Sequence, residues 1–253
     1  MKDFTFSIYK KLLRTLKENN YSFVTFEEFQ TKSKNSKVVV LRHDVDRYPN
    51  NASIMSGIEN EFNVKATYNF RILPRIFKNE IVQDIVQKGH EMAYHYEDLT
   101  ITKGNYQKAI LHFQKQLQRI REFYPTKTIC MHGSPMSRWD NRELWSKYDY
   151  RDYGIIAEPY FDVDYSEVFY LTDTGRAWNN ESVIVRDKVK SGFNIQINST
   201  KHMIELFRQG KMPDKIIINT HPHRWFDFGV GWTKELIMQN VKNVVKRLIV
   251  RNK

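Results

Sequence analysis

The sequence has only one cysteine among its 253 residues, and this excludes an internal disulfide bond. Cys130 lies in an apolar-flanked stretch, 128–131, which favours a buried and chemically inert thiol. Glycine and proline are also few, with 10 and 7 residues, so collagen-like and low-complexity chains are excluded. Hydrophobic residues make up 41% of the chain, and this fraction predicts a compact fold with a sizeable core.

Long apolar runs are missing as well. No stretch approaches the roughly 20 apolar residues that a membrane-spanning helix requires. The N-terminal region is interrupted by lysine and arginine residues from Lys10 to Lys17, so it offers no uninterrupted apolar core for a signal peptide. These two absences predict a soluble, cytoplasmic protein without a transmembrane segment.

Acidic residues are in the minority. The chain holds 29 aspartate and glutamate residues against 40 lysine and arginine residues, a net charge of +11. Such an excess favours polyanionic neighbours, namely nucleic acid, an anionic bilayer surface or sugars carried on phosphate. The lysines are scattered along the expected helices, however, and no arginine-rich block or known nucleic-acid motif is present. The pattern therefore indicates a solvated basic surface and argues against nucleic-acid binding.

Short apolar runs alternate with amphipathic stretches along most of the chain. Strands separated by helices of this length form parallel βαβ units, whose strands are covered on both faces and read as continuous apolar runs. No G-x-G-x-x-G follows the first expected strand, so a dinucleotide-binding sheet has no support. The expected strands are 38–41, 65–70, 91–95, 128–132, 154–157, 168–172, 193–197 and 216–220, and the expected helices are 7–19, 51–62, 78–87, 105–123, 141–148, 201–208 and 234–249.

Seven or eight parallel strands favour an α/β barrel over an open doubly wound sheet. No linker rich in glycine, proline or serine and no internal repeat marks a domain boundary. We therefore expect one domain over residues 1–253, with an N-terminal helical extension over about residues 1–36. Residues 179–190 form the least regular stretch and are interpreted as an excursion from the alternation of strands and helices.

Polar residues follow four of the expected strands at the point where each strand ends. In a parallel barrel the carboxyl ends of the strands converge on one mouth, so these side chains are expected to meet there. The four clusters are Arg-His-Asp-Val-Asp at 42–46, His-Tyr-Glu-Asp at 95–98, His-Gly-Ser-Pro at 132–135 and His-Pro-His at 221–223.

Alternate residues of a strand share a face, so Arg42, Asp44 and Asp46 point the same way if the strand stays extended. Two carboxylates that close raise each other's pKa unless a cation lies between them, and a metal ion together with Arg42 would serve. Asp46 and His95 are candidate ligands of a divalent metal, because carboxylate and imidazole suit zinc and its first-row relatives. Such a metal lowers the pKa of bound water toward about 7. With Asp44 as the base and His221 as the acid, the pattern indicates a hydrolase.

These motifs resemble those of the polysaccharide deacetylase superfamily, the NodB-type fold of carbohydrate esterase family four, and most closely its branch with an R-H-D-V-D first motif. The resemblance runs along most of the chain and implies a distorted (β/α)7 barrel that removes acetyl groups from N-acetylated sugars. It also implies that Asp44 is the catalytic base, that Asp46 and His95 bind the metal, and that His221 is the catalytic acid. The matching stretches are RHDVD at 42–46, GHE at 89–91, YHYEDL at 94–99, CMHGSPMSRWDN at 130–141 and INTHPH at 218–223.

Two features depart from the family pattern. The family usually has a second metal histidine four residues after the first, and here Leu99 occupies that position. Asp98 and His132 are the alternative third ligands, and zinc is the expected metal, with nickel or cobalt as alternatives. The third motif also lacks the family's arginine-proline-aromatic order.

Three stretches, 138–140, 171–179 and 223–225, each place an arginine next to or near a tryptophan. Arginine can grip a carboxylate or phosphate, and tryptophan can stack on the apolar face of a sugar ring. Such loops suit an acylated amino sugar or another saccharide that bears negative charge. In the second stretch a tight turn with its tryptophan as a hydrophobic plug is an equal alternative. The candidate substrate-binding residues are Arg42, His132, Arg138, Trp139, Arg176 and Trp178.

The leading hypothesis is metal-dependent removal of an acyl group from an amino sugar, in a precursor of a surface polysaccharide or glycolipid. A catalytically inactive saccharide-binding barrel that has lost its metal is the alternative. Structural roles also stay open, because Asp44 and Asp46 could cap the following helix and His95 could pack at the rim of the barrel.

Overall fold

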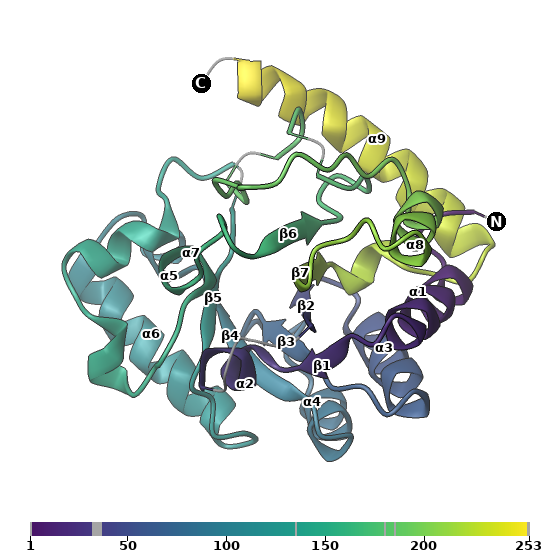
Figure 1. The fold of residues 1–253 in the computed structure, drawn as a ribbon. Coiled ribbons are helices and arrows are strands. Elements are labelled where there is room, and N and C mark those ends of the chain that lie inside the picture. Colours follow the sequence, from purple (N-terminus) through teal and green to yellow (C-terminus); the bar gives the residue numbers. More distant parts are fainter. Residues whose placement is uncertain (1, 32–36, 135, 180, 185, 252–253) are drawn as a thin grey trace.

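The computed structural model describes residues 2–31, 37–134, 136–179, 181–184 and 186–251. Its centre is a parallel seven-stranded sheet, in which six strands follow the order β5-β4-β3-β2-β7-β6 (Figure 1). The seventh strand, β1, pairs with the start of β2, where Ser22 lies opposite Val38. The strands are β1(Ser22–Val24), β2(Val38–Val45), β3(Thr67–Phe70), β4(Glu91–Tyr96), β5(Ile129–Met131), β6(Phe169–Thr172) and β7(Lys215–Thr220).

The sheet curves like part of a barrel, and its edge strands β5 and β6 do not pair with each other in the described part of the chain. Beyond β5, the expected strand 154–157 is reduced to a single parallel bridge between Thr128 and Ala157. The expected strand 193–197 is wrong, because its residues form no ladder, although Phe193 and Ile195 pack against the core. An α/β fold with a parallel sheet is confirmed, whereas the seven-unit count of a (β/α)7 barrel stays a prediction.

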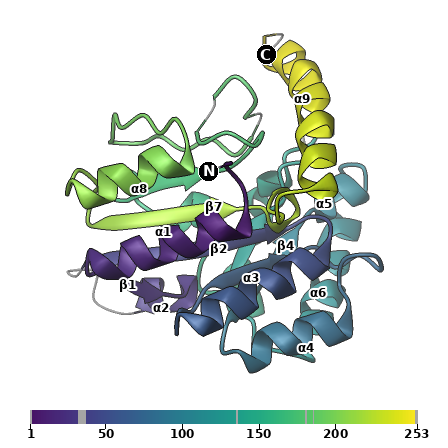
Figure 2. The same ribbon diagram turned by 90° about the vertical axis from the view of Figure 1, so that its right-hand side faces the viewer.

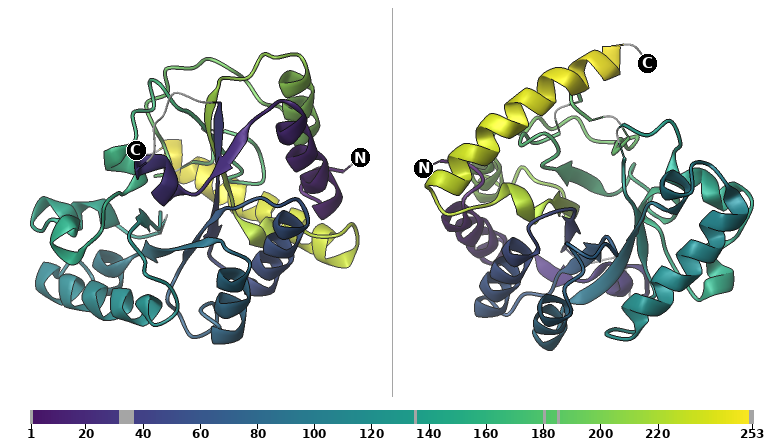
Figure 3. Two further views of the ribbon diagram at one scale, coloured as in Figure 1. Left: turned by 60° about the horizontal axis from the view of Figure 1, so that its bottom comes forward. Right: turned by 180° about the vertical axis from the view of Figure 1, so that it is seen from behind.

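Helices α1, α3, α4 and α6 lie around the outside of the sheet (Figures 1 and 3). Side chains cap some of them: Thr5 accepts a hydrogen bond from the Ile8 N–H at the start of α1, and Asn105 accepts one from Lys108 at the start of α6. The helices are α1(Phe6–Glu18), α2(Phe26–Thr31), α3(Pro49–Glu61), α4(Asn79–Gln87), α5(Asp98–Ile101), α6(Tyr106–Arg121), α7(Pro159–Asp162), α8(Thr200–Arg208) and α9(Val230–Arg251), with 3-10 helices η1(Asn141–Ser146), η2(Tyr150–Tyr153) and η3(Pro222–Arg224).

Most of the helix predictions are confirmed. The expected helices 7–19, 51–62, 78–87, 105–123 and 201–208 correspond to α1, α3, α4, α6 and α8. The stretch 141–148 forms only the 3-10 helix η1, and α9 begins before the expected residue 234. The short elements β1, α2 and α5 were not expected, because runs of three to six residues carry little periodic signal.

β2 lies near the middle of the sheet, and all eight of its residues are buried. Its neighbours β3 and β7 place Asn69 beside Asp44 and Asn219 beside Arg42 in the two ladders. The strand that carries the charged motif is therefore fixed from both sides.

The C-terminal helix α9 lies beyond the end of the sheet at which β7 finishes (Figure 2). Over residues 230–245 the buried positions of this helix are polar, since Glu235, Gln239 and Asn243 face the protein. By contrast, Ile237 and Val241 are exposed. Within the described residues, no helix combines the length and apolar character that crossing a bilayer requires.

Candidate metal centre and active site

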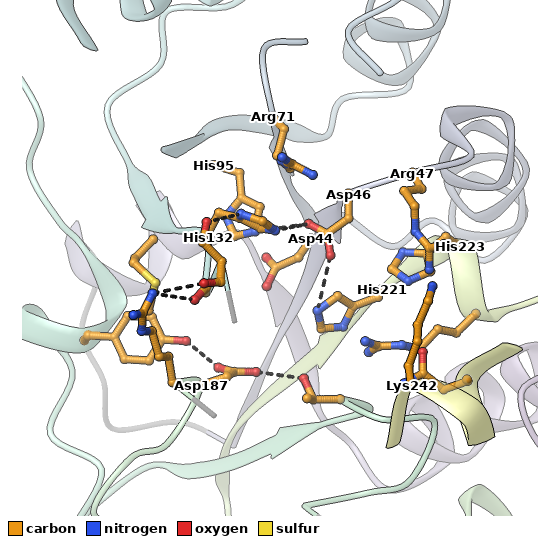
Figure 4. A pocket seen from close by; sticks show the side chains of 18 residues that line it. Asp44, Asp46, Arg47, Arg71, His95, His132, Asp187, His221, His223 and Lys242 are labelled. Atoms are coloured by element: carbon orange, nitrogen blue, oxygen red, sulfur yellow. Dashed lines mark hydrogen bonds and ion pairs between the residues drawn. The ribbon is translucent and has the colours of Figure 1, made fainter. Parts of the chain in front are cut away.

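A pocket of about 290 Å³ lies at the carboxyl ends of the strands (Figure 4). Asp44 and Asp46 reach it from the end of β2 and His95 from β4. His132 follows β5, and His221 follows β7. The structure thus brings together side chains from all four polar clusters.

Asp46, His95 and His132 direct three ligand atoms toward one point. The Nε2 atoms of His95 and His132 each lie 3.5 Å from Oδ1 of Asp46. These residues form one of two groups, among the residues described, whose potential ligand atoms all lie within 4.8 Å of one another. Oδ1 of Asp46 is buried and, within the described part of the chain, has no hydrogen-bond donor. Such an arrangement costs free energy unless a cation is bound. One carboxylate and two imidazoles fit a zinc-type ion.

Outer contacts orient both imidazoles. Nδ1 of His95 donates to the carbonyl oxygen of Cys130 at 2.9 Å. Nδ1 of His132 donates to Oε2 of Glu97 at 3.0 Å. Because carbonyl and carboxylate oxygens only accept, each ring keeps a proton on Nδ1, and its Nε2 on the side of Asp46 is the atom that would bind a metal ion.

The charges of this group reinforce one another. Burial by itself raises the pKa of Asp46, but the neighbouring histidines outweigh burial and hold that pKa well below its ordinary value. Burial lowers the pKa of His95, whereas Asp44 and Asp46 raise it, and the net shift is upward. His95 therefore favours a positive charge beside the two carboxylates, and a bound metal ion would replace that proton.

The second group of potential ligand atoms consists of Asp44, His95 and Cys130. Burial, opposed by the nearby Arg42, raises the pKa of the Cys130 thiol well above its ordinary value. A thiol that stays protonated is a poor metal ligand. The chemistry of the side chains therefore favours the group around Asp46.

Asp98 lies outside both groups. It is the first residue of α5, and its buried carboxylate accepts a hydrogen bond from the Tyr94 hydroxyl at 2.9 Å. His112, on α6, contacts the same carboxylate through Nδ1. Of the two alternatives for a third ligand, the structure places His132 next to Asp46, while the turn into α5 directs Asp98 toward α6. Leu99 is fully buried in the core.

Asp44 is held by donors on neighbouring strands. Its Oδ1 accepts from Nδ2 of Asn69 at 2.7 Å, and its Oδ2 accepts from Nδ2 of Asn219 at 2.9 Å. Burial raises the pKa of Asp44, but Arg42 and the histidines of the pocket outweigh burial and lower it strongly. Asp44 is therefore ionised and fixed in orientation at the pocket.

His221 is paired with Asp173, which follows β6. Nδ1 of His221 donates to Oδ1 of Asp173 at 2.7 Å, and Nε2 lies 3.9 Å from Oδ2 of Asp46. Asp173 also accepts from Arg224 at 2.7 Å and from Nε1 of Trp225 at 2.8 Å. Burial raises the pKa of Asp173, but Arg224 and His221 hold it below its ordinary value. Sequence reasoning noticed Asp173 only as part of a loop and missed this pairing.

Most of the expected substrate-binding residues lie outside the pocket lining, and His132 is the exception. Trp178 is buried and donates from Nε1 to Thr200, so it is the hydrophobic plug of the alternative interpretation. Arg176 donates to the carbonyl oxygen of Trp232. Arg138 is exposed and stacks on Trp139, with 4.3 Å between its guanidinium carbon and the ring centroid. Arg42 is buried beneath Asp44 and is likewise absent from the lining.

Several residues that line the pocket were missed in the sequence. Arg47 and Arg71 follow β2 and β3, while the others lie in α7, in the loop after β6 and in α9. Asp187, for example, accepts hydrogen bonds from the hydroxyls of Tyr170 and Thr174. The lining residues without an earlier assignment include Arg47, Arg71, Tyr160, Arg186, Asp187 and Lys242.

No family model matches the sequence, and no curated protein matches it significantly. Solved structures do match. BA3943, a CE4 family pseudoenzyme from Bacillus anthracis, matches with 14% identity and a TM-score of 0.46, over 85% of this chain and 63% of that one. A Streptococcus mutans CE4 esterase matches with 15% identity and a TM-score of 0.47, over 91% and 89% of the two chains. The peptidoglycan deacetylase PdaC from Bacillus subtilis matches with 17% identity and a TM-score of 0.41, over 86% and 99%.

The chain is thus similar to proteins of carbohydrate esterase family four, the family that its motifs resemble. It spans less than two thirds of the length of BA3943. With identities of 14 to 17% and TM-scores below 0.5, these matches assign neither an activity nor a substrate to the chain.

Proposed function

We propose that the protein is a metal-dependent hydrolase that removes an acetyl or similar acyl group from an amino sugar. The observation that carries this proposal is the convergence of Asp46, His95 and His132 beside an ionised Asp44 and an Asp173-bound His221. A set of metal ligands next to a base and an acid can catalyse the hydrolysis of an amide or ester.

Each residue of the site would have a separate role in hydrolysis. Asp46, His95 and His132 would hold the metal, which when bound polarises a carbonyl group and lowers the pKa of water. Asp44 lies beside them and would accept the proton of the attacking water. His221 would donate a proton from Nε2 to the leaving amine, while Asp173 stabilises the charged ring through Nδ1.

The substrate proposed is an acylated amino sugar in a precursor of a surface polysaccharide or glycolipid. The net charge of +11 supports an anionic carrier for that sugar. The finer choices, zinc over nickel or cobalt and an acetyl over a longer acyl group, follow from the ligand types and the family resemblance.

A second candidate is a saccharide-binding protein without turnover. The observation that favours it is the strong stabilisation of the Asp44 carboxylate, which accepts hydrogen bonds from two amides and a guanidinium. A carboxylate stabilised in this way is a weak base.

Metal binding and acetate release separate the two candidates. Purified chain stripped with chelator should bind one zinc by calorimetry and then release acetate from N-acetylglucosamine oligomers. His132→Ala should abolish both. His112→Ala is the matched control, because it removes an imidazole that pairs with Asp98 outside the pocket, and it should leave both intact. No acetate release from any acylated amino sugar would favour the second candidate, whether or not zinc binds, and no metal binding would refute the hydrolase.

A further inference from the structure

One wall of the pocket is basic and incompletely balanced. Arg47 follows β2, His223 lies in η3, and Lys242 lies on α9, and the three side chains gather on one side of the pocket (Figure 4). The His223 ring lies next to the His221 ring, with 5.7 Å between centroids. We propose that this wall binds an oxyanion, a phosphate or carboxylate, carried by the saccharide. The inference rests on the proposed function and names its substrate class.

The basic wall is defined as Arg47, His223 and Lys242, and the buried carboxylate of Glu235 on α9 acts on both of its cations. Among the described residues, Glu235 is the only carboxylate that pairs with Arg47, at 3.5 Å. Lys242 has no carboxylate within ion-pair distance in the part of the chain that the structure describes. Burial and the like charge of Arg47 lower the pKa of Lys242, and the carboxylate of Glu235 offsets only part of that shift. An anion placed between these groups would relieve that repulsion.

His223 supplies an independent sign of a missing ligand. The residue is 2% exposed, and its buried Nδ1 atom has no hydrogen-bond partner among the residues that the structure describes. Burial, together with Arg224, lowers the pKa of His223 well below its ordinary value, so the ring is neutral. A neutral imidazole still has one N–H to donate, and leaving a buried polar atom unpaired costs free energy. An oxyanion offers several acceptor oxygens to such a donor.

Two other cations of the pocket, Arg71 and Arg186, already have partners. Arg71 donates from Nε to Glu97 at 2.8 Å. Arg186 donates to the backbone carbonyl oxygens of Gly133, Ser134 and Ser137. The donors of these two side chains are therefore satisfied, and an incoming anion gains most at the basic wall.

The position of the wall defines the substrate further. His221, the proposed acid, lies between Asp46 and His223, so the anion would sit close to the sugar that carries the acyl group. A pocket of about 290 Å³ is small for a ligand site. These dimensions favour a single sugar with an attached oxyanion over several residues of a neutral polymer.

Binding of unreactive sugars tests the proposal without requiring turnover. Glucosamine 1-phosphate and glucuronic acid carry no acyl group. Glucosamine is the counterpart of the first without the phosphate, and glucose is the counterpart of the second without the carboxylate. Calorimetry on the full chain, with and without zinc, should show at least tenfold tighter binding of one anionic sugar than of its counterpart. The anionic sugar that binds more tightly than its counterpart identifies the oxyanion as phosphate or carboxylate.

Lys242→Gln should remove most of this gain and leave the binding of glucosamine or glucose unchanged. Lys234→Gln is the matched control, because Lys234 is an exposed lysine of the same helix outside the pocket lining, and it should keep the gain. Equal affinities for charged and uncharged sugars, or equal losses in both variants, would overturn the proposal. Preference for the anionic sugar without acetate release would keep the basic wall and refute only the hydrolase.

Discussion

Arg42 and Asp44 lie two residues apart on β2, and Nη2 of Arg42 is 3.4 Å from Oδ2 of Asp44. Both residues are almost fully buried: 1% of the surface of Arg42 and 4% of that of Asp44 is exposed. Two nitrogen atoms of Arg42, Nε and Nη1, have no hydrogen-bond partner in the described residues. Asp44 is thus the main compensation for a buried guanidinium as well as the proposed base.

Asp44→Asn should abolish acetate release and also lower the free energy of unfolding, by roughly 3 kcal/mol, because Arg42 loses its counter-charge. Urea denaturation checks the second effect. Arg42→Met combined with Asp44→Asn should recover most of the stability while activity stays lost. If Asp44→Asn alone is as stable as the parent chain, the buried pair contributes little.

Asp173→Asn should reduce kcat by between about 10²- and 10⁴-fold, because His221 loses the carboxylate that orients its ring and stabilises its charged form. KM and zinc affinity should change little, since Asp173 is not a metal ligand. Asp98→Asn is the control, because it alters another buried aspartate–histidine pair outside the pocket. Equal losses of kcat in both variants would indicate a general effect on folding.

Stability should depend on pH through Glu158. This carboxyl is buried and accepts the backbone N–H of Met131 at 3.1 Å, and burial raises its pKa to about 7 from 4.5. Between these two values the folded chain keeps a proton that the unfolded chain loses, so the contribution to stability is complete below pH 4.5 and disappears as the pH rises through 7. The loss would be on the order of 3 kcal/mol.

Glu158→Gln isolates that contribution, because the amide keeps an acceptor oxygen but does not titrate. The difference in free energy of unfolding between the two chains should vary from pH 4.5 to 7 in the stated direction. A constant difference over this range would contradict the raised pKa.

Tyr9→Phe should destabilise the fold by roughly 1 to 2 kcal/mol, because Glu59 is fully buried and loses one of its donors. Tyr150→Phe is the comparison, since its hydroxyl donates to Asp162 in a partly exposed setting. Thermal unfolding should show the larger effect for Tyr9. Equal shifts would mean that the burial of Glu59 adds nothing.

The residues of the proposed metal group could largely be found from the sequence. Asp46, His95 and His132 all follow apolar runs, and parallel strands deliver their carboxyl ends to one place. The choice between His132 and Asp98 could not be made, because it depends on the residue at which β4 stops and α5 begins. Boundaries of this kind are set by tertiary packing as well as by local propensity.

The substrate-binding residues were harder to predict. A tryptophan beside an arginine has the same sequence pattern whether it stacks on a sugar or fills the core. Trp178 packs against Phe4 and Trp225, which are distant in the sequence. Arg47 and Lys242 meet at the pocket only because α9 places its polar face against the protein.

Glu59 joins parts of the chain that are far apart in sequence: its carboxylate contacts Tyr9 on α1, His43 on β2 and Tyr68 on β3. His43 directly precedes Asp44 and faces the opposite side of the same strand. The first helix therefore helps to fix the strand that carries Asp44 on its other face. Removing this helix to obtain a minimal catalytic fragment is expected to yield an inactive or insoluble product.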